Sequence, residues 1–241
     1  MPDSPDFNKY QPGSVRFSLQ DLGELAVRLG SFHIADRRGE LIFSDDIRGG
    51  LAGWSVAIGG TGASVSVVAG VRLHNKFSIL LTGGSTSTKA ALISTFIPVT
   101  QRSKIGFETA LQIGNNLDTI TGELDYFSSI VNYTAQFRID RVNHLLQLLD
   151  EFGAWITPYP FSLNSLTSGS ICNLKLVFDI LTGKYVRLIL NGLEVDISAY
   201  GMSDPGSSVE NTFRILYDAR SAGAFNGACY VNHVIVTANE P

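Results

Sequence analysis

The side chains most able to do chemistry are spread along the chain without an active-site spacing. The chain has four histidines, which are His33, His74, His144 and His233. No two of them stand at the short spacing of a metal-ligand motif, and none combines with a serine or cysteine and an acid in a nucleophilic arrangement. The glycine-rich run 59–62 precedes a strand pattern instead of a helix, unlike a phosphate-binding loop. We therefore assign no catalytic residue, metal site or cofactor, and expect a protein that is not an enzyme.

Exposed aromatic rings offer a different chemistry, because a ring with an apolar face and a polar edge can bind a sugar. Tyr133 falls on the apolar face of its predicted strand and is assigned to the core. The position of Trp54 at the end of a loop is more typical of a buried side chain that fills the core than of a surface platform. Trp155 and Tyr159, with prolines beside Tyr159, form the best pair. The candidate carbohydrate-binding residues are Trp155, Tyr159, Trp54 and Tyr126.

The stretch 174–197 has the clearest pattern, and the elements that must position any site are inferred outward from it. Apolar and polar residues alternate here with the period of two that indicates strands. Thr182-Gly183 and Asn191-Gly192 interrupt the runs, and Asn-Gly between alternating runs favours a type I′ hairpin turn. Three antiparallel strands are predicted, whose outward side chains are Lys175, Asp179, Tyr185, Arg187, Glu194 and Asp196.

The same reasoning predicts strands through most of the chain after residue 40. They cover 40–43, 65–71, 77–82, 90–99, 104–113, 123–129, 130–140, 144–150, 155–156, 212–217 and 228–237. Segment 144–150 also matches a helical template, but its strand neighbours favour a strand. Residues 203–208 are predicted to be a loop. Many short strands with glycine-rich turns and little helix indicate an all-β fold, a two-sheet antiparallel β-sandwich.

The first 39 residues are expected to differ from the rest. Residues 1–17 are rich in Pro, Asp, Ser and Gly and predict an extended arm, and Ser18 is a helix N-cap candidate. The short helix would end at Gly30 and carry an apolar stripe of Leu19, Leu22, Leu25 and Leu29. This helix could lie on its own sandwich or dock on a neighbouring subunit. We therefore divide the chain into an arm and amphipathic helix, 1–39, and a sandwich domain, 40–241.

Composition excludes several classes of partner. Of 241 residues, 44% are hydrophobic and 17% charged, which suits a large core, and the net charge of −4 gives no basic field for nucleic acid. The N-terminus lacks a Sec signal pattern and no run is long enough to span a membrane. We expect synthesis in the cytoplasm, no membrane insertion and no nucleic-acid partner. Cys172 and Cys229 are expected to be buried free thiols, with a single disulfide as the alternative.

The sequence resembles the concanavalin A-like (laminin-G-like, lectin and glucanase) jelly-roll superfamily. The segments that carry the resemblance are DDIRGGLAGW at 45–54, LTGKYVRLILNGLEVDIS at 181–198 and YVNHVIVT at 230–237. It covers residues 40–240 and implies a jelly-roll sandwich. The superfamily includes glycosidases, lectins, adhesion modules and virion proteins, so the resemblance does not fix a function.

Two family sites can be tested on the sequence. Glycosidases of this fold carry a Glu-x-Asp-x-x-Glu strand; here Glu123 and Asp125 match, but Ser128 replaces the acid that would protonate the leaving group. We reject a glycosidase and expect Glu123 and Asp125 on a solvated strand face. The family's calcium ligands are also replaced, by Arg48 and by Asn232-His233, which leaves Asp45 and Asp46 as turn formers.

Two hypotheses follow. The first is a non-catalytic structural protein, a jelly-roll subunit of a large assembly, most concretely a phage or virus virion protein of the decoration or fibre type. Its partners would be further copies of itself or other subunits. The second is a carbohydrate-binding module that recognises a polysaccharide through Trp155 and Tyr159.

Overall fold

The described parts of the chain consist of strands, turns and loops. The computed structural model describes residues 38–69, 77–84, 90–99, 103–158, 169–206, 211–221 and 227–241. Within these ranges there is no helix, and so none that could cross a membrane. The predicted arm and helix lie outside them, together with Leu19, Leu22, Leu25 and Leu29. What the structure describes is therefore the predicted sandwich.

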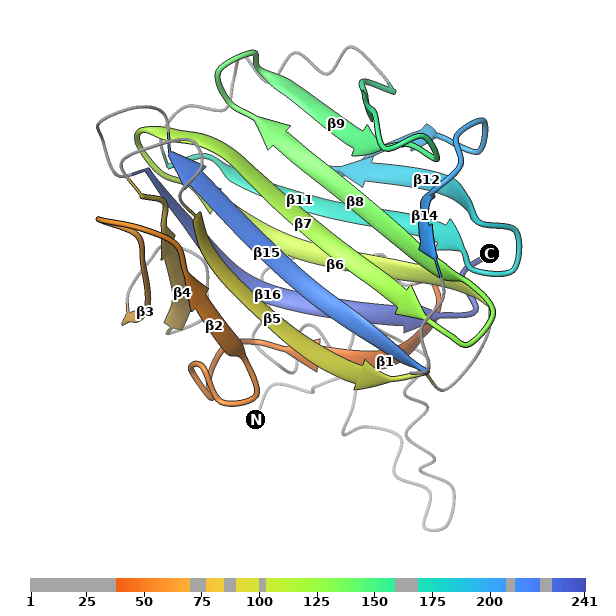
Figure 1. Ribbon diagram of the computed structural model, residues 1–241, viewed down its shortest axis with the longest axis horizontal. Coiled ribbons are helices and arrows are strands. Elements are labelled where there is room, and N and C mark those ends of the chain that lie inside the picture. Colours follow the sequence, from red (N-terminus) through yellow and green to blue (C-terminus); the bar gives the residue numbers. More distant parts are fainter. Residues whose placement is uncertain are drawn as a thin grey trace, which may run out of the picture.

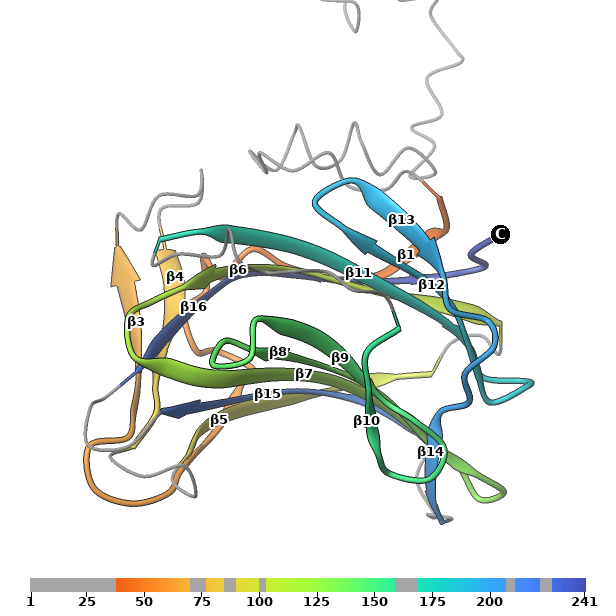
Figure 2. The ribbon, with the colours of Figure 1, turned by 90° about the horizontal axis from the view of Figure 1, so that it is seen from above.

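Two antiparallel eight-stranded sheets lie face to face, as Figures 1 and 2 show. Sheet A has the order β13-β12-β11-β6-β16-β4-β3, and β1 also pairs with β16. Its strands are β1 (Glu40–Asp45), β3 (Ser64–Ala69), β4 (Phe77–Thr82), β6 (Lys104–Ile113), β11 (Ile171–Asp179), β12 (Lys184–Leu190), β13 (Leu193–Asp196) and β16 (Ala228–Ala238).

Sheet B faces the viewer in Figure 1 and has the order β10-β9-β8-β7-β15-β5-β2, with β14 also paired to β8. Its strands are β2 (Ser55–Ile58), β5 (Ala90–Pro98), β7 (Leu117–Phe127), β8 (Asn132–Asp140), β9 (Leu145–Leu149), β10 (Trp155–Ile156), β14 (Ser203–Gly206) and β15 (Thr212–Ser221). The predicted all-β antiparallel sandwich is thus confirmed.

The hairpins predicted in 174–197 are present as β11, β12 and β13. Asn191 and Gly192 have φ angles of 48° and 87°, the positive values that a type I′ turn requires. The ambiguous segment 144–150 contains a strand, β9, which pairs with β8 and β10. Local alternation and turn chemistry were sufficient to predict these elements.

Several details of the prediction are wrong. Tyr185 was expected to point outward, but it is buried in the core because an irregularity in the β11–β12 register leaves Val186 unpaired, so Tyr185 lies opposite Phe178. Its hydroxyl donates to the Leu149 carbonyl of sheet B at 2.7 Å. Strand β7 begins at Leu117 instead of residue 123, and residues 203–206 of the predicted loop form β14.

Aromatic rings from both sheets fill the centre of the sandwich. The ring of Phe107 on β6 lies 6.0 Å from that of Phe137 on β8 and 6.0 Å from that of Tyr217 on β15. A side chain at Gly122 is excluded, because a Cβ there would lie 2.3 Å from Phe137 Cζ. Glycine at this place in β7 therefore allows the Phe137 ring to cover the strand.

Cys172 and Cys229 are buried free thiols, as expected. Burial raises the pKa of the Cys172 thiol to about 12. Both thiols behave as small apolar side chains of the core.

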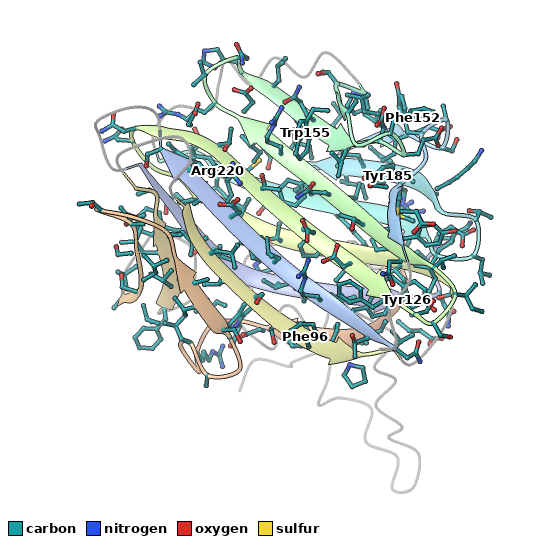
Figure 3. All side chains as sticks on the ribbon, viewed as in Figure 1. Phe96, Tyr126, Phe152, Trp155, Tyr185 and Arg220 are labelled. Carbon is teal, nitrogen blue, oxygen red and sulfur yellow. The ribbon has the colours of Figure 1, made fainter. Side chains whose placement is uncertain are left out.

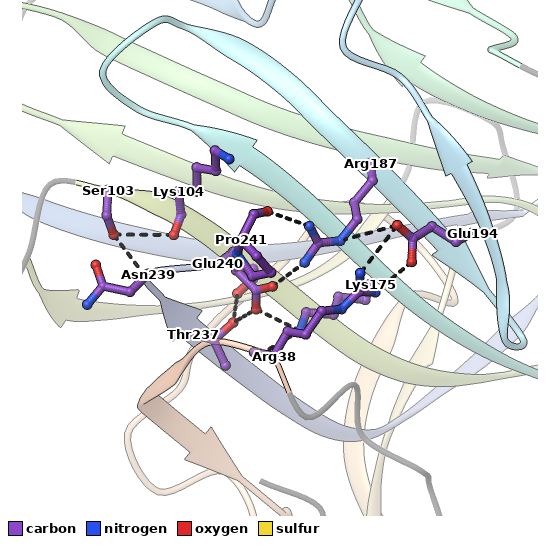
Figure 4. A network of polar contacts seen from close by, with 11 residues as sticks. Arg38, Ser103, Lys104, Lys175, Arg187, Glu194, Thr237, Asn239, Glu240 and Pro241 are labelled. Carbon is purple, nitrogen blue, oxygen red and sulfur yellow. Dashed lines mark hydrogen bonds and ion pairs between the residues drawn. The ribbon is translucent and has the colours of Figure 1, made fainter. Parts of the chain in front are cut away.

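A buried charge cluster ties the last residues to the outer face of sheet A (Figure 4). Lys175 Nζ lies 2.7 Å from Glu240 Oε1, and Arg187 Nη2 pairs with Glu240 Oε2. Thr237 Oγ1 also donates to Glu240 Oε1 at 2.5 Å. Lys175 and Arg187 were predicted as outward charges; they do leave the core, but Glu240 covers them. Burying a charge is costly, and the ion pairs in this cluster offset that cost.

We expect Glu240→Gln to lower the free energy of unfolding by about 3 kcal/mol, because it removes the carboxylate that pairs with both buried cations, Lys175 and Arg187. Urea denaturation measures the effect. The control is Arg48→Gln, which removes an ion pair with Asp46 in which the Arg48 side chain is 58% exposed. It should cost less than about 1 kcal/mol. Equal losses in the two variants would contradict the assigned role of Glu240.

Candidate saccharide-binding pocket on sheet B

The outer face of sheet B, seen in Figure 3, contains a pocket of about 360 Å³. Strand β7 supplies Thr119, Thr121 and Glu123 to its lining, and β8 supplies Gln136 and Arg138. The rest of the lining comes from β5, β10 and β15, as Leu92, Trp155, Leu216, Asp218 and Arg220. Five strands of sheet B therefore build one site.

The depth of the pocket follows from side-chain length. Thr121 on the central strand β7 pairs with Arg138 on one side and with Asp218 on the other. Two residues before it, Thr119 pairs with Arg220. Directly opposite residues of neighbouring strands point to the same face, so two short threonines lie between longer side chains. The threonines form a floor and their neighbours form walls.

Trp155 and Arg138 form one wall as a stacked pair. The Arg138 guanidinium carbon lies 4.1 Å from the centroid of the Trp155 ring. Arg138 Nε and Nη2 donate to Gln147 Oε1 at 3.0 and 2.6 Å. Burial lowers the pKa of Arg138, without removing its charge at neutral pH. The ring and the amide together hold the guanidinium in one orientation.

Glu123 and Asp125 share one arginine beside the pocket. Arg214 Nη2 lies 2.9 Å from Glu123 Oε1 and Arg214 Nε donates to Asp125 Oδ2 at 2.7 Å. Gln136 Nε2 donates to Glu123 and Thr134 Oγ1 to Asp125, both at 2.6 Å. Burial, followed by the nearby Asp125 charge, raises the pKa of Glu123 from 4.5 to about 8. Glu123 and Asp125 were expected on a solvated strand face. This expectation is wrong, because Arg214 and the neighbouring side chains cover both carboxyl groups.

Asp218 and Arg220 form the opposite wall. Arg220 Nε and Nη2 both donate to Asp218 Oδ2, at 2.9 and 2.7 Å. Asp218 Oδ1 is buried and has no hydrogen-bond partner among the residues that the structure describes. The Arg220 side chain is 49% exposed. The pair gives the pocket a fixed carboxylate and a guanidinium that reaches toward solvent.

The structure separates the four sequence candidates for carbohydrate binding. Trp155 lines the pocket. Trp54 is buried, with Nε1 donating to Asp45 Oδ2 at 2.7 Å, and Tyr126 is buried against Phe213. Neither ring is therefore available as a surface platform. Tyr159 lies outside the described residues, so its pairing with Trp155 stays a prediction.

Ser128, at the position of the missing family acid, is used in the turn between β7 and β8. Its hydroxyl donates to the Val131 carbonyl at 2.7 Å and accepts from the amides of Ile130 and Val131. At the positions considered for calcium, Asn232 accepts a hydrogen bond from Ser78, and His233 is buried 3.9 Å from Glu108. Across the described ranges, no three His, Cys, Asp or Glu side chains gather as metal ligands.

Sequence reasoning missed most of the pocket, including Arg138, Asp218 and Arg220. The alternation within 130–140 did place Arg138 on the polar face of its strand. It gave no reason to choose Arg138 as a binding residue over the other polar residues of that face. Asp218 and Arg220 lie beyond the end of the strand predicted at 212–217, which continues to Ser221. A longer β15 would have put both on the same face as Arg214.

Comparisons with known proteins identify the fold only. No protein-family model matches the sequence, and no curated protein matches it. A conserved carbohydrate esterase of the Shiga toxin-encoding bacteriophage phi24B superposes with a TM-score of 0.56 at 10% identity, over 84% of this chain and 100% of that chain. Lectin II from Ulex europaeus gives a TM-score of 0.51 at 10% identity, over 83% and 99% of the two chains. A Bacillus subtilis protein of unknown function with a galectin-like fold gives 0.51 at 12% identity, over 83% and 97%. The chain thus shares a lectin-like and galectin-like sandwich, in agreement with the predicted resemblance at the level of fold.

The raised pKa of Glu123 predicts a dependence of stability on pH. The folded protein keeps this proton up to about pH 8, whereas the unfolded chain releases it near 4.5. The resulting stabilisation is complete below the lower value and is lost as pH rises through the higher one. We expect wild type to lose free energy of unfolding over that window relative to Glu123→Gln, which does not titrate. Urea denaturation across the window measures this, and parallel pH profiles for the two proteins would contradict it.

Proposed function

We propose that the protein is a non-catalytic carbohydrate-binding β-sandwich of the lectin-like jelly-roll type, and that its saccharide site is the pocket on sheet B. The observation that carries the proposal is the lining of that pocket. An indole ring, two guanidinium groups, two carboxyl groups and an amide meet over a threonine floor. A saccharide offers apolar ring faces and many hydroxyls, which suit a concave site of apolar surface with a few placed polar groups.

The absence of catalysis is part of the proposal and rests on how the carboxyl groups are engaged. Glu123 and Asp125 both bind Arg214, and Asp218 binds Arg220. A glycosidase needs one carboxyl free to protonate the leaving group and a second to attack or to activate water. Release of new reducing ends from a bound polysaccharide, lost in Glu123→Gln, would overturn this part of the proposal.

We expect Trp155→Ala to weaken polysaccharide binding by about 10- to 30-fold, because it removes ring contact area and the support of Arg138. Isothermal titration calorimetry, with a polysaccharide identified on a glycan array, measures the loss. The matched control is Phe152→Ala. Phe152 is 85% exposed in the turn before β10 and does not line the pocket, so its removal should leave affinity unchanged.

Two results would count against this site. One is silence of the wild-type protein across a broad glycan array. The other is binding that survives Trp155→Ala and Arg138→Gln at full strength, because the saccharide would then occupy another surface.

A second candidate is the subunit of a larger assembly, with a virion protein as its most concrete form. The observation that favours it is an exposed apolar edge. Within the described ranges, strand β2 pairs with β5 alone and β3 with β4 alone, and together they expose Val56, Ile58 and Val67. Unpaired edge strands with exposed apolar residues are sites for pairing between chains.

If this edge pairs chains, the molecular mass in solution should exceed that of one 26.1 kDa chain. Light scattering after size-exclusion chromatography measures it, and Ile58→Lys should return the protein to monomer. A wild-type protein that stays monomeric at high concentration would contradict assembly through the β2–β3 edge.

A further inference from the structure

We propose that the pocket on sheet B selects saccharides that carry a carboxylate, as uronic acids do, through the guanidinium groups of Arg138 and Arg220. This inference rests on the proposed saccharide site and assigns its ligand class. It follows from how the two arginines are held, from the charge of the lining and from the register of the strands.

Arg138 is oriented by partners that do not neutralise it. Gln147 accepts from Nε and Nη2, and the Trp155 ring covers one face of the guanidinium. Both partners are uncharged. Among the described residues, Nη1 makes no hydrogen bond, so a donor remains on a fixed cation in the pocket wall. A fixed guanidinium loses little conformational entropy when a ligand binds.

Arg220 is held differently, because its partner is charged. Asp218 Oδ2 accepts from Nε and Nη2 and leaves Nη1 without a hydrogen bond within the described part of the chain. The side chain is half exposed, so a ligand can reach it. The pocket therefore has two arginines, one hydrogen-bonded to a carboxylate, Asp218, and one whose hydrogen-bond partner is uncharged.

The charges of the lining do not cancel. Arg138 and Arg220 contribute two positive charges and Asp218 one negative charge, and Glu123 is mainly protonated at neutral pH because its pKa is raised to about 8. An excess of one positive charge remains. The nearby Asp140 does not line the pocket and binds the amide and side chain of Asn143. Arg214 is engaged by Asp125 and Glu123. One ligand carboxylate would balance the net charge of the lining side chains.

The register brings the two guanidiniums to the same ligand group. Arg138 lies opposite Thr121 from the β8 side, and Arg220 lies opposite Thr119 from the β15 side. The two threonines are alternate residues of β7, about 6.5 to 7 Å apart on one face. A carboxylate above this floor lies between the arginines, with hydroxyls below it. Guanidinium groups match the planar carboxylate with paired hydrogen bonds.

The test compares acidic polysaccharides with their own carboxyl-reduced forms, in which a neutral CH₂OH replaces each carboxylate. The probes are polygalacturonate, alginate and hyaluronan, titrated calorimetrically at low and moderate salt. We expect at least one acidic polymer to bind about tenfold or more tightly than its reduced form, and its affinity to fall with added salt. Arg138→Gln should abolish the preference, and so should Arg220→Gln, whose exposed side chain makes misfolding a poor explanation. Arg48→Gln, at an exposed arginine paired with Asp46, is the control and should change nothing.

The outcomes separate this inference from the proposed function. Equal binding of acidic and reduced polymers, or binding of neutral saccharides alone that is still lost in Trp155→Ala, would overturn the carboxylate preference and leave the saccharide site standing. Retention of the preference in both arginine variants would overturn the assigned residues. Silence across the glycan array would overturn the saccharide site itself.

Discussion

The alternation of side chains along β7 is the constraint on which the rest of the structure depends. Ile120 and Leu124 point into the core with Gly122 between them, where the Phe137 ring takes the space of a side chain. Thr119, Thr121 and Glu123 point the other way and line the pocket. Because side chains alternate with a period of two, a shift of one residue against β8 and β15 would exchange these sets. A single register therefore fixes the core and the site together.

Both faces of the sandwich carry charges that are largely removed from water, with different consequences. On sheet A, Glu240 pairs with both Lys175 and Arg187 and holds the last residues against the sheet. On sheet B, Arg214 is shared by two carboxyls, and burial, followed by the nearby Asp125 charge, raises the pKa of Glu123 and keeps a proton on it. The first cluster holds chain segments together. The second cluster borders a pocket. Because its side chains already hold one another in place, they lose little conformational entropy when a ligand binds.

Sequence reasoning succeeded where the information is local and failed where it is not. Alternation and the Asn191-Gly192 turn were enough for the hairpins. Tyr185 was misplaced because a register irregularity at Val186 reverses the alternation. Glu123 was read as solvated because its cover, Arg214, lies 91 residues away. The pocket could not be predicted from the sequence for the same reason. Its lining residues range from 92 to 220 in the chain and come together only when five strands lie side by side in sheet B.

A saccharide bound in the proposed pocket would lie beside Trp155. The chain has two tryptophans, and they lie in different environments. Trp155 lines the pocket, whereas Trp54 is buried with its Nε1 hydrogen-bonded to Asp45. The most direct measurement follows the two indole Nε1–H signals by NMR while an oligosaccharide that the protein retains, with oligogalacturonate as the first probe, is titrated. We expect the Trp155 signal to shift with the saturation of binding and the Trp54 signal to stay in place. Saturable binding that leaves the Trp155 signal unmoved would contradict it.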